Sequence, residues 1–328
     1  MQPATALKFS VHHEWGALRE VIVGIGQDAV VPKWYEGLAF MAAETQQFCQ
    51  EYGGRPMSDY DPQYASDLIE QEETLAAILG KLGIQVHRVS RLSEPERSDL
   101  TEAGEGVQTF ARDAIIVIGD KIIEASLKLY CRRRERWGFR NILNKLLIDQ
   151  DYANWVSVPP ASPDPRKNEG PFLEGGDTFL NGFEIYVGIS GLASDLKGAK
   201  WLQGYLGPSY SVMPVRLRRD VLHLDCCMAL LKPGLGLICR PKILDPLPGQ
   251  LKDFEFVEVS EEEAHHLGTN VLVLDERRVI MDSKFERIAE ALRNKGQEVI
   301  LTPYQAPSFL GGGFRCSHHP IRRDSELS

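Results

Sequence analysis

One short unit recurs along this chain: an apolar strand, a tight polar turn, a second apolar strand, an amphipathic helix and often a further strand. Four hairpins carry it, and one of them turns at Asn181-Gly182, a dipeptide that strongly favours a two-residue hairpin turn. The predicted hairpins pair Ala114–Val117 with Ile122–Ala125, Thr178–Leu180 with Glu184–Ile189, Cys226–Leu231 with Leu237–Cys239, and Val271–Leu274 with Val279–Met281. A fifth unit is expected where Leu18–Val23 pairs with the segment near Cys316. The repeat therefore favours an α/β ring closed by its two ends.

Helices and loops follow from the same pattern. Ser283–Lys295 is predicted as a helix with a capping box at Ser283 and Glu286, and Tyr64–Leu82 as a helix that Gly83 ends. The basic run Arg132–Arg134 is predicted to lie on the solvated face of a helix. Three segments rich in turn-forming residues are expected to be surface loops and a candidate lid, namely Pro32–Tyr60, Pro159–Gly170 and Pro241–Leu251.

Composition narrows the class of protein. The 328 residues carry a formal charge of -9, which makes nucleic acid an unfavourable partner. No segment has the pattern of a secretory signal or a membrane span, so a cytoplasmic protein is expected. The six cysteines show no regular spacing and are expected to be reduced. We expect one catalytic domain over residues 1–328, with a homodimer as one candidate assembly.

Ionisable and polar residues recur at one place in each unit, at or just before the first hairpin strand. They are Arg112-Asp113, Glu174-Gly-Gly-Asp177, His223-Leu-Asp225, Thr269-Asn270 and Gly311-Gly-Gly-Phe-Arg-Cys316. Equivalent strand starts meet at one end of a ring, so these residues are expected to share a pocket. Charged groups that lead into buried strands are costly unless they are paired or functional.

Cys316 is the candidate nucleophile. It follows three glycines, which permit a close approach of a ligand to the backbone. A thiol attacks as the thiolate, so a positive charge is expected near it, from Arg315 or from a bound cation. The other five cysteines are expected to be inert, namely Cys49, Cys131, Cys226, Cys227 and Cys239.

His223 and Asp225 would face the same side of a strand, where the imidazole can move protons while the carboxylate orients it or binds a cation. Glu174 and Asp177 suit acid and base chemistry, metal ligation or a cradle for a planar cation, and residue types alone do not choose. The paired histidines lack the spacing of a metal site. They are His12-His13, His265-His266 and His318-His319. We therefore expect no metal and no cofactor.

These motifs resemble the amidinotransferases that act on arginine with glycine or inosamine-phosphate, within a larger group that includes arginine deiminases and dimethylarginine dimethylaminohydrolases. The similarity runs nearly end to end. It is carried by His13-Glu-Trp15 with Leu18–Gly24, Ala111-Arg-Asp113 with Ile118–Ala125, Asn270–Asp275, and Gly311–Cys316 with Arg322-Arg323.

The resemblance implies a fivefold pseudosymmetric α/β propeller of ββαβ-type modules. It implies that Cys316 forms a covalent amidino adduct, that His223 protonates the leaving amine and later activates the acceptor, and that Glu174 pairs with His223 or with the guanidinium. Asp113 and Asp225 match positions that bind the guanidinium. The expected substrate-binding residues also include Asp177, Arg240 and Asn270, with Arg240 near a position that binds a carboxylate.

Two departures keep alternatives open. Leu173-Glu-Gly-Gly-Asp177 looks more like the hydrolases of this group, and Arg315 stands where the transferases usually have histidine. The expected function is transfer of an amidino group from an arginine-like donor, with L-arginine as the expected guanidino substrate, to an amine acceptor. Hydrolysis of a guanidino compound at the same site is the first alternative. An arginine-binding protein with weak or no catalysis is the second, and a metal-dependent amidohydrolase is the third.

Overall fold

The computed structural model describes residues 9–103, 106–148, 154–162, 164 and 167–324. Fifteen strands lie in this part of the chain. Their bounds are β1 Ala17–Val23, β2 Gln85–Arg88, β3 Ile115–Ile118, β4 Lys121–Glu124, β5 Asn154–Ser157, β6 Thr178–Asn181, β7 Glu184–Ile189, β8 Ser211–Arg216, β9 Met228–Lys232, β10 Leu235–Ile238, β11 Glu255–Glu258, β12 Leu272–Asp275, β13 Arg278–Asp282, β14 Glu298–Thr302 and β15 His318–Asp324.

The strands form five sheets of three strands each, in a mixed α/β fold. Their strand orders are β15-β1-β2, β3-β4-β5, β6-β7-β8, β9-β10-β11 and β12-β13-β14. In every sheet the middle strand pairs antiparallel with one neighbour and parallel with the other. The four predicted hairpins and the predicted pairing of the terminal segments are present. Because β1 pairs with β15, the first sheet joins the two ends of the described chain.

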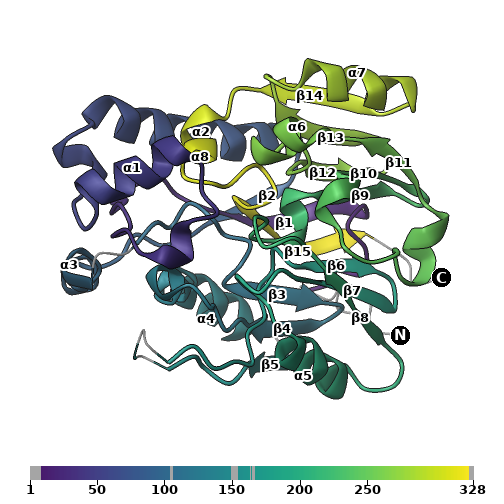
Figure 1. Cartoon of the computed structure of the whole chain (residues 1–328), viewed down its shortest axis with the longest axis horizontal. Coiled ribbons are helices and arrows are strands. Elements are labelled where there is room, and N and C mark those ends of the chain that lie inside the picture. The colour runs from purple at the N-terminus through teal and green to yellow at the C-terminus, as the bar shows by residue number, and fades with distance from the viewer. Residues whose placement is uncertain (1–8, 104–105, 149–153, 163, 165–166, 325–328) are drawn as a thin grey trace.

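The α-helices are α1 Ala43–Tyr52, α2 Pro62–Lys81, α3 Glu94–Ala103, α4 Arg140–Ile148, α5 Leu196–Leu206, α6 Glu261–His265, α7 Glu286–Asn294 and α8 Gln305–Phe309. Figure 1 shows α5 beside β8 and α7 beside β14, so each covers a strand of the sheet whose last two strands it connects. Leu68, Leu75 and Leu79 form a buried stripe on α2. None of the described helices has the length and apolar character that crossing a membrane requires.

Glycine residues in the turns explain why the hairpins could be predicted from the sequence. Gly119, Gly182 and Gly234 have φ angles of 58°, 64° and 73°, in the left-handed region that side chains disfavour. The strands they connect are almost wholly buried, as in Ile115–Ile118, where all four residues are buried. Local turn chemistry and continuous apolar runs therefore fix these elements together.

Several predicted details are wrong. Ser283 does not cap α7, because Phe285 precedes the helix and the amide of Ser283 donates instead to the carbonyl of Thr302. A capping box is present at Ser260 and Glu263, where none was predicted. The predicted loop Pro32–Tyr60 contains α1, and Pro241–Leu251 includes parts of two 3-10 turns. Part of the predicted loop Pro159–Gly170 lies outside the described residues.

Two further corrections concern the site. His223-Leu-Asp225 is not a strand, because Leu224–Cys226 forms a 3-10 turn in which the amide of Asp225 donates to the carbonyl of Gly176. The basic run Arg132–Arg134 is not a solvated helical face. Tyr130–Arg132 is a 3-10 turn, and only 9% of Arg132 is exposed.

Candidate active site

Cys316 lies buried in the turn that leads into β15, three residues after the last of the three glycines. A Cβ atom on Gly312 would lie 2.2 Å from the ring of Phe110, and one on Gly313 would lie 2.8 Å from Oδ1 of Asn270. Larger residues would therefore push the loop away from its neighbours. The glycines that the sequence analysis linked to a close approach serve here to pack Cys316 against Asn270.

Asn270 holds the thiol and its backbone at once. Its Nδ2 lies 3.2 Å from Sγ of Cys316, and its Oδ1 accepts hydrogen bonds from the amides of Arg315 and Cys316 at 2.9 and 3.2 Å. The side chain of Asn270 is thus engaged with the loop of Cys316. Its predicted role in binding substrate stays a prediction.

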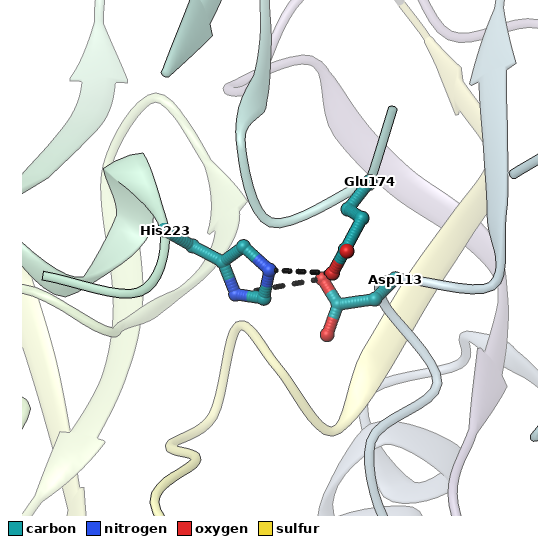
Figure 2. A group of neighbouring side chains, drawn as sticks. All are labelled: Asp113, Glu174 and His223. Atoms are coloured by element: carbon teal, nitrogen blue, oxygen red, sulfur yellow. Dashed lines mark hydrogen bonds and ion pairs between the residues drawn. The ribbon is translucent and has the colours of Figure 1, made fainter. Parts of the chain in front are cut away.

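His223 forms the second part of the site, together with two carboxylates. Its Nε2 lies 2.8 Å from Oε2 of Glu174 and its Nδ1 lies 3.9 Å from Oδ1 of Asp113, as Figure 2 shows. Burial lowers the pKa of His223, but Asp113 and Glu174 outweigh this effect and raise it to about 10. The ring is therefore an imidazolium near neutral pH, the form that donates a proton.

Asp113 is a fully buried carboxylate that keeps its charge. Its Oδ1 accepts from the amide of Gly176 at 2.7 Å, and its Oδ2 lies 2.8 Å from Nη2 of Arg132. Burial alone would raise the pKa of Asp113, yet His223 and Arg132 bring it down to about 2. Asp113 therefore stays ionised, as a carboxylate that binds a cation must.

Arg132 and Glu135 are site residues that the sequence analysis missed. Nε and Nη2 of Arg132 each lie 2.8 Å from an oxygen of Glu135, a bidentate pair. Burial raises the pKa of Glu135 to about 7 despite this partner. Nothing local in an Arg-Arg-Arg-Glu run distinguishes the one arginine that turns inward, because its partner Asp113 lies 19 positions away.

Asp225 is a further carboxylate close to Cys316. Its Oδ2 is 3.1 Å from Nη1 of Arg315 and 3.8 Å from Sγ of Cys316. Arg315 also contacts Glu14 at 3.2 Å, and 2% of it is exposed. Arg315 is therefore committed to protein carboxylates and does not present its charge in the cavity.

The thiol of Cys316 is protonated in the absence of a ligand. Burial, followed by the charges of Asp225 and Asp113, raises the pKa of Cys316 well above its usual value. A cation placed opposite these carboxylates would offset their charge and favour the thiolate. The electrostatics thus couple activation of Cys316 to the arrival of a positively charged substrate.

Asp177 and Arg240 are placed differently. The carboxylate of Asp177 accepts from the amides of Leu224 and Ser194, both at 3.0 Å, so it ties down the turn that carries His223. Arg240 donates to the carbonyls of Ile243 and Asp245 and is not among the residues that border the cavity of Cys316. The structure does not bring either residue to the nucleophile, and their substrate-binding roles stay predictions.

A small cavity of about 50 Å³ joins the reactive groups. Asp113, Arg132, Glu135, His223 and Cys316 border it, with apolar walls from Phe110, Leu129, Leu222 and Leu310. A larger cavity of about 290 Å³ lies next to it. Both are bordered by Phe40, Met41, Leu222 and Gly311. The predicted lid segment therefore contributes to the walls of both cavities.

Three side chains of the site have the spacing of a metal ligand set. Donor atoms of Asp113, Glu174 and His223 all lie within 4.8 Å of one another. Each is already engaged, since Asp113 holds Arg132 while Glu174 and His223 bind each other. Metal binding would break these contacts, and we assign no metal to the site.

Comparison with known proteins identifies the family. The family model described as eukaryotic N,N dimethylarginine dimethylhydrolase matches residues 56–323. An L-arginine:L-lysine amidinotransferase of Pseudomonas savastanoi pv. phaseolicola is 26% identical over 352 aligned residues, covering 96% of this chain and 94% of the relative. An inosamine-phosphate amidinotransferase of Streptomyces griseus is 27% identical, with 96% of each chain covered.

Solved structures agree. An amidinotransferase of the saxitoxin pathway from Microseira wollei has a TM-score of 0.84 at 25% identity, with coverage of 98% of this chain and 99% of that one. The predicted resemblance to amidinotransferases is thereby confirmed. The family model matches most of the chain, and the chain therefore belongs to the N,N-dimethylarginine dimethylhydrolase family, with amidinotransferases among its relatives.

Proposed function

We propose that this protein is an amidinotransferase that moves an amidino group from an arginine-like donor to an amine through a covalent adduct on Cys316. The observation that carries the proposal is the single cavity bordered by a thiol, an imidazolium and an ionised carboxylate, from Cys316, His223 and Asp113. These are the groups needed to attack, to protonate and to hold a guanidinium. The relatives named above are amidinotransferases.

The first half of the reaction follows from the positions of these groups. Asp113 and Asp225 attract the donor guanidinium, and its charge lets Cys316 give up its proton to the solvent. Sγ then bonds to the central guanidino carbon, and as the tetrahedral species collapses the carbon–nitrogen bond to the leaving amine breaks. His223 supplies the proton that this amine needs, while Glu174 holds the ring by its Nε2.

The second half reverses these roles. His223 is now the neutral base that accepts a proton from the acceptor amine as its nitrogen attacks the adduct. The sulfur leaves as thiolate. The new guanidinium, which carries the positive charge, then dissociates from the carboxylates. The cavity of about 290 Å³ next to the site provides room for an acceptor much larger than water. This supports transfer.

A hydrolase is the second candidate. It shares the first half of the reaction and replaces the acceptor amine with water. The match to the dimethylhydrolase model and the Glu174-Gly-Gly-Asp177 sequence favour it. The two functions differ only in which nucleophile reaches the adduct.

The decisive assay incubates the protein with L-arginine, with and without glycine, lysine or an amino-sugar, and measures ornithine, citrulline and ammonia by mass spectrometry. Ornithine that forms only with an amine, together with a new guanidino product, supports transfer. Citrulline and ammonia without an amine would establish hydrolysis instead. No turnover by wild-type protein with arginine or substituted guanidines would overturn both.

The finer architecture belongs to the same proposal. We infer that the five sheets surround one axis as a fivefold pseudosymmetric α/β propeller of ββαβ-type modules, in one catalytic domain over residues 1–328. The shared pairing order of the sheets and the contact of β1 with β15 support this arrangement. None of the six cysteines, all in the described part of the chain, forms a disulfide, which suits a reducing cytoplasm. Light scattering tests the homodimer, which stays an expectation.

A further inference from the structure

Three guanidinium groups gather in the interior, from Arg112, Arg315 and Arg323. None of the three residues is more than 6% exposed. Two carboxylates accompany them, from Glu14 and Asp225. Arg315 binds both carboxylates, at 3.2 Å and 3.1 Å, so these two anions share one cation.

The other two guanidinium groups have neutral partners. Arg112 donates to the carbonyl of Arg315 at 3.2 Å and lies 3.3 Å from Nε2 of His318. Arg323 donates to the carbonyls of Gly16 and Val273 at 2.7 and 2.9 Å, and its Nε has no partner. Within the described part of the chain, neither forms an ion pair. Two buried cations without an anion of their own are an unusual and costly arrangement.

The charges remain in place at neutral pH. Burial, and then the charge of Arg315, lowers the pKa of Arg112 to about 9, and burial is also the main reason that the pKa of Arg323 falls to about 10. Glu14 stays ionised, because Arg315 and Arg112 outweigh its burial and lower its pKa. Three positive charges therefore face the two negative charges of Glu14 and Asp225. Asp275 also raises the pKa of Arg323, but Asp275 is paired with Arg278, so a surplus of one positive charge remains.

Two small cavities lie beside these charged groups. Each has a volume of about 10 Å³ and is bordered by Glu14, Arg112 and Arg323. One of them is also bordered by Arg315 and His318, so all three guanidinium groups meet it. Its volume leaves room for about one water-sized species. Phosphate, sulfate and carboxylates are too large.

We propose that the cavity bordered by Arg112, Arg315 and Arg323 binds one small monovalent anion of the size of chloride. A single negative charge balances the surplus and gives the free Nε of Arg323 an acceptor. A water molecule would satisfy the hydrogen bond but would leave the net charge uncompensated. The neighbouring Glu14 does not fill this place, because Arg315 and the amide of Leu180 already occupy its oxygens.

The anion would connect two segments of the chain that are distant in sequence. Arg112 directly precedes Asp113, and Arg315 directly precedes Cys316. An ion held by both arginines therefore links the segments that carry two groups of the catalytic cavity. The inference rests on the buried charges and the cavity between them and does not depend on which reaction the protein performs.

The test combines crystallography with thermal unfolding. Wild-type crystals grown with bromide in place of chloride should show an anomalous peak between the three guanidinium groups. At constant ionic strength, replacing gluconate with chloride should raise Tm by about 2 °C for each tenfold increase above the dissociation constant. Arg323→Met should abolish this dependence.

Arg322→Met is the matched control on the same strand. Arg322 lies 3.5 Å from Glu20, and its side chain is 33% exposed, so its loss should leave the chloride dependence intact. Equal chloride dependence in Arg323→Met and wild type would overturn the proposal. So would the absence of a bromide peak, a result that remains decisive if Arg323→Met fails to fold.

Discussion

Nη2 of Arg132 lies 2.8 Å from Oδ2 of Asp113, so a guanidinium of the protein itself occupies the carboxylate that is proposed to hold the substrate guanidinium. A substrate must therefore share Asp113 with Arg132 or use its other face. The same arginine neutralises Glu135. One cation thus compensates two carboxylates at the inner end of the cavity.

Arg132→Met should destabilise the protein by about 3–5 kcal/mol, because it leaves Asp113 and Glu135 buried without their cation. Urea unfolding at pH 7 measures the loss. Arg134→Met is the control, since Arg134 pairs with Asp99 at the surface, where 24% and 48% of the two side chains are exposed. Its effect should be within about 1 kcal/mol. Similar losses in both variants would contradict the structural role of Arg132.

The contrast between Arg132 and the hairpins explains what the sequence could predict. The turns at Gly119, Gly182 and Gly234 depend on a few neighbouring residues, so pattern and turn chemistry revealed them. The burial of Arg132 and Arg315 depends on partners distant in sequence, Asp113 and Glu14, and no local pattern reveals such pairs. Cys316, His223, Glu174 and Asp113 were found because each begins an equivalent part of the repeat.

The His223 error has a similar cause. The alternation His-Leu-Asp has the period of a strand, but the amides of Cys226 and Cys227 donate to the carbonyls of His223 and Leu224 and close a 3-10 turn. The structure brings His223 next to Glu174 and Asp113, but through a turn rather than a strand. The catalytic roles of these residues stay predictions, which rest on side-chain type rather than on local conformation.

The pairing of His223 with Glu174 predicts a dependence of stability on alkaline pH. The pKa of His223 is raised to about 10 in the folded state, so the native protein retains a proton that the unfolded chain loses near pH 6.5. The free energy of unfolding should therefore decrease as pH rises through this interval. In Glu174→Gln the pKa of His223 should fall and this decrease should become smaller, as measured by urea unfolding at pH 7, 8 and 9. Identical slopes for the two proteins would refute the pairing.

Cys316→Ala should reduce turnover by at least about a thousandfold, because its Sγ is the proposed nucleophile that forms the adduct. Donor binding should persist in calorimetry, since Asp113 and Asp225 remain. Cys239→Ala serves as the control, because Cys239 is buried in the apolar core and should leave kcat unchanged. Turnover by Cys316→Ala near the wild-type rate would rule out the covalent mechanism.

Asn270→Asp tests whether Asn270 tunes the thiol. The substitution keeps the acceptor for the amides of Arg315 and Cys316 but replaces the Nδ2 donor, 3.2 Å from Sγ, with an anionic oxygen. The thiolate should become less favourable, so kcat should fall and the pH at which iodoacetamide alkylates Cys316 should rise. Asn270→Ala should instead cost about 1–3 kcal/mol of stability, because it leaves buried amides without an acceptor. Unchanged alkylation in Asn270→Asp would show that the contact with Sγ does not control the pKa of the thiol.

Leu267 shows strain beside the larger cavity. Its φ is 70°, a conformation that costs a residue with a side chain about 1–2 kcal/mol, and it borders the cavity proposed to admit the acceptor. The carbonyl of Leu267 accepts the amide of Asn270 at 2.9 Å, so this backbone also leads into the site. Leu267→Gly should relieve the strain and raise the unfolding free energy, while KM for the acceptor increases because the cavity loses an apolar wall. Leu244→Gly, at an exposed position with 58% of the residue accessible, should lower stability and leave KM unchanged. A loss of stability in Leu267→Gly without any change in KM would show that this conformation neither stores strain nor shapes the acceptor cavity.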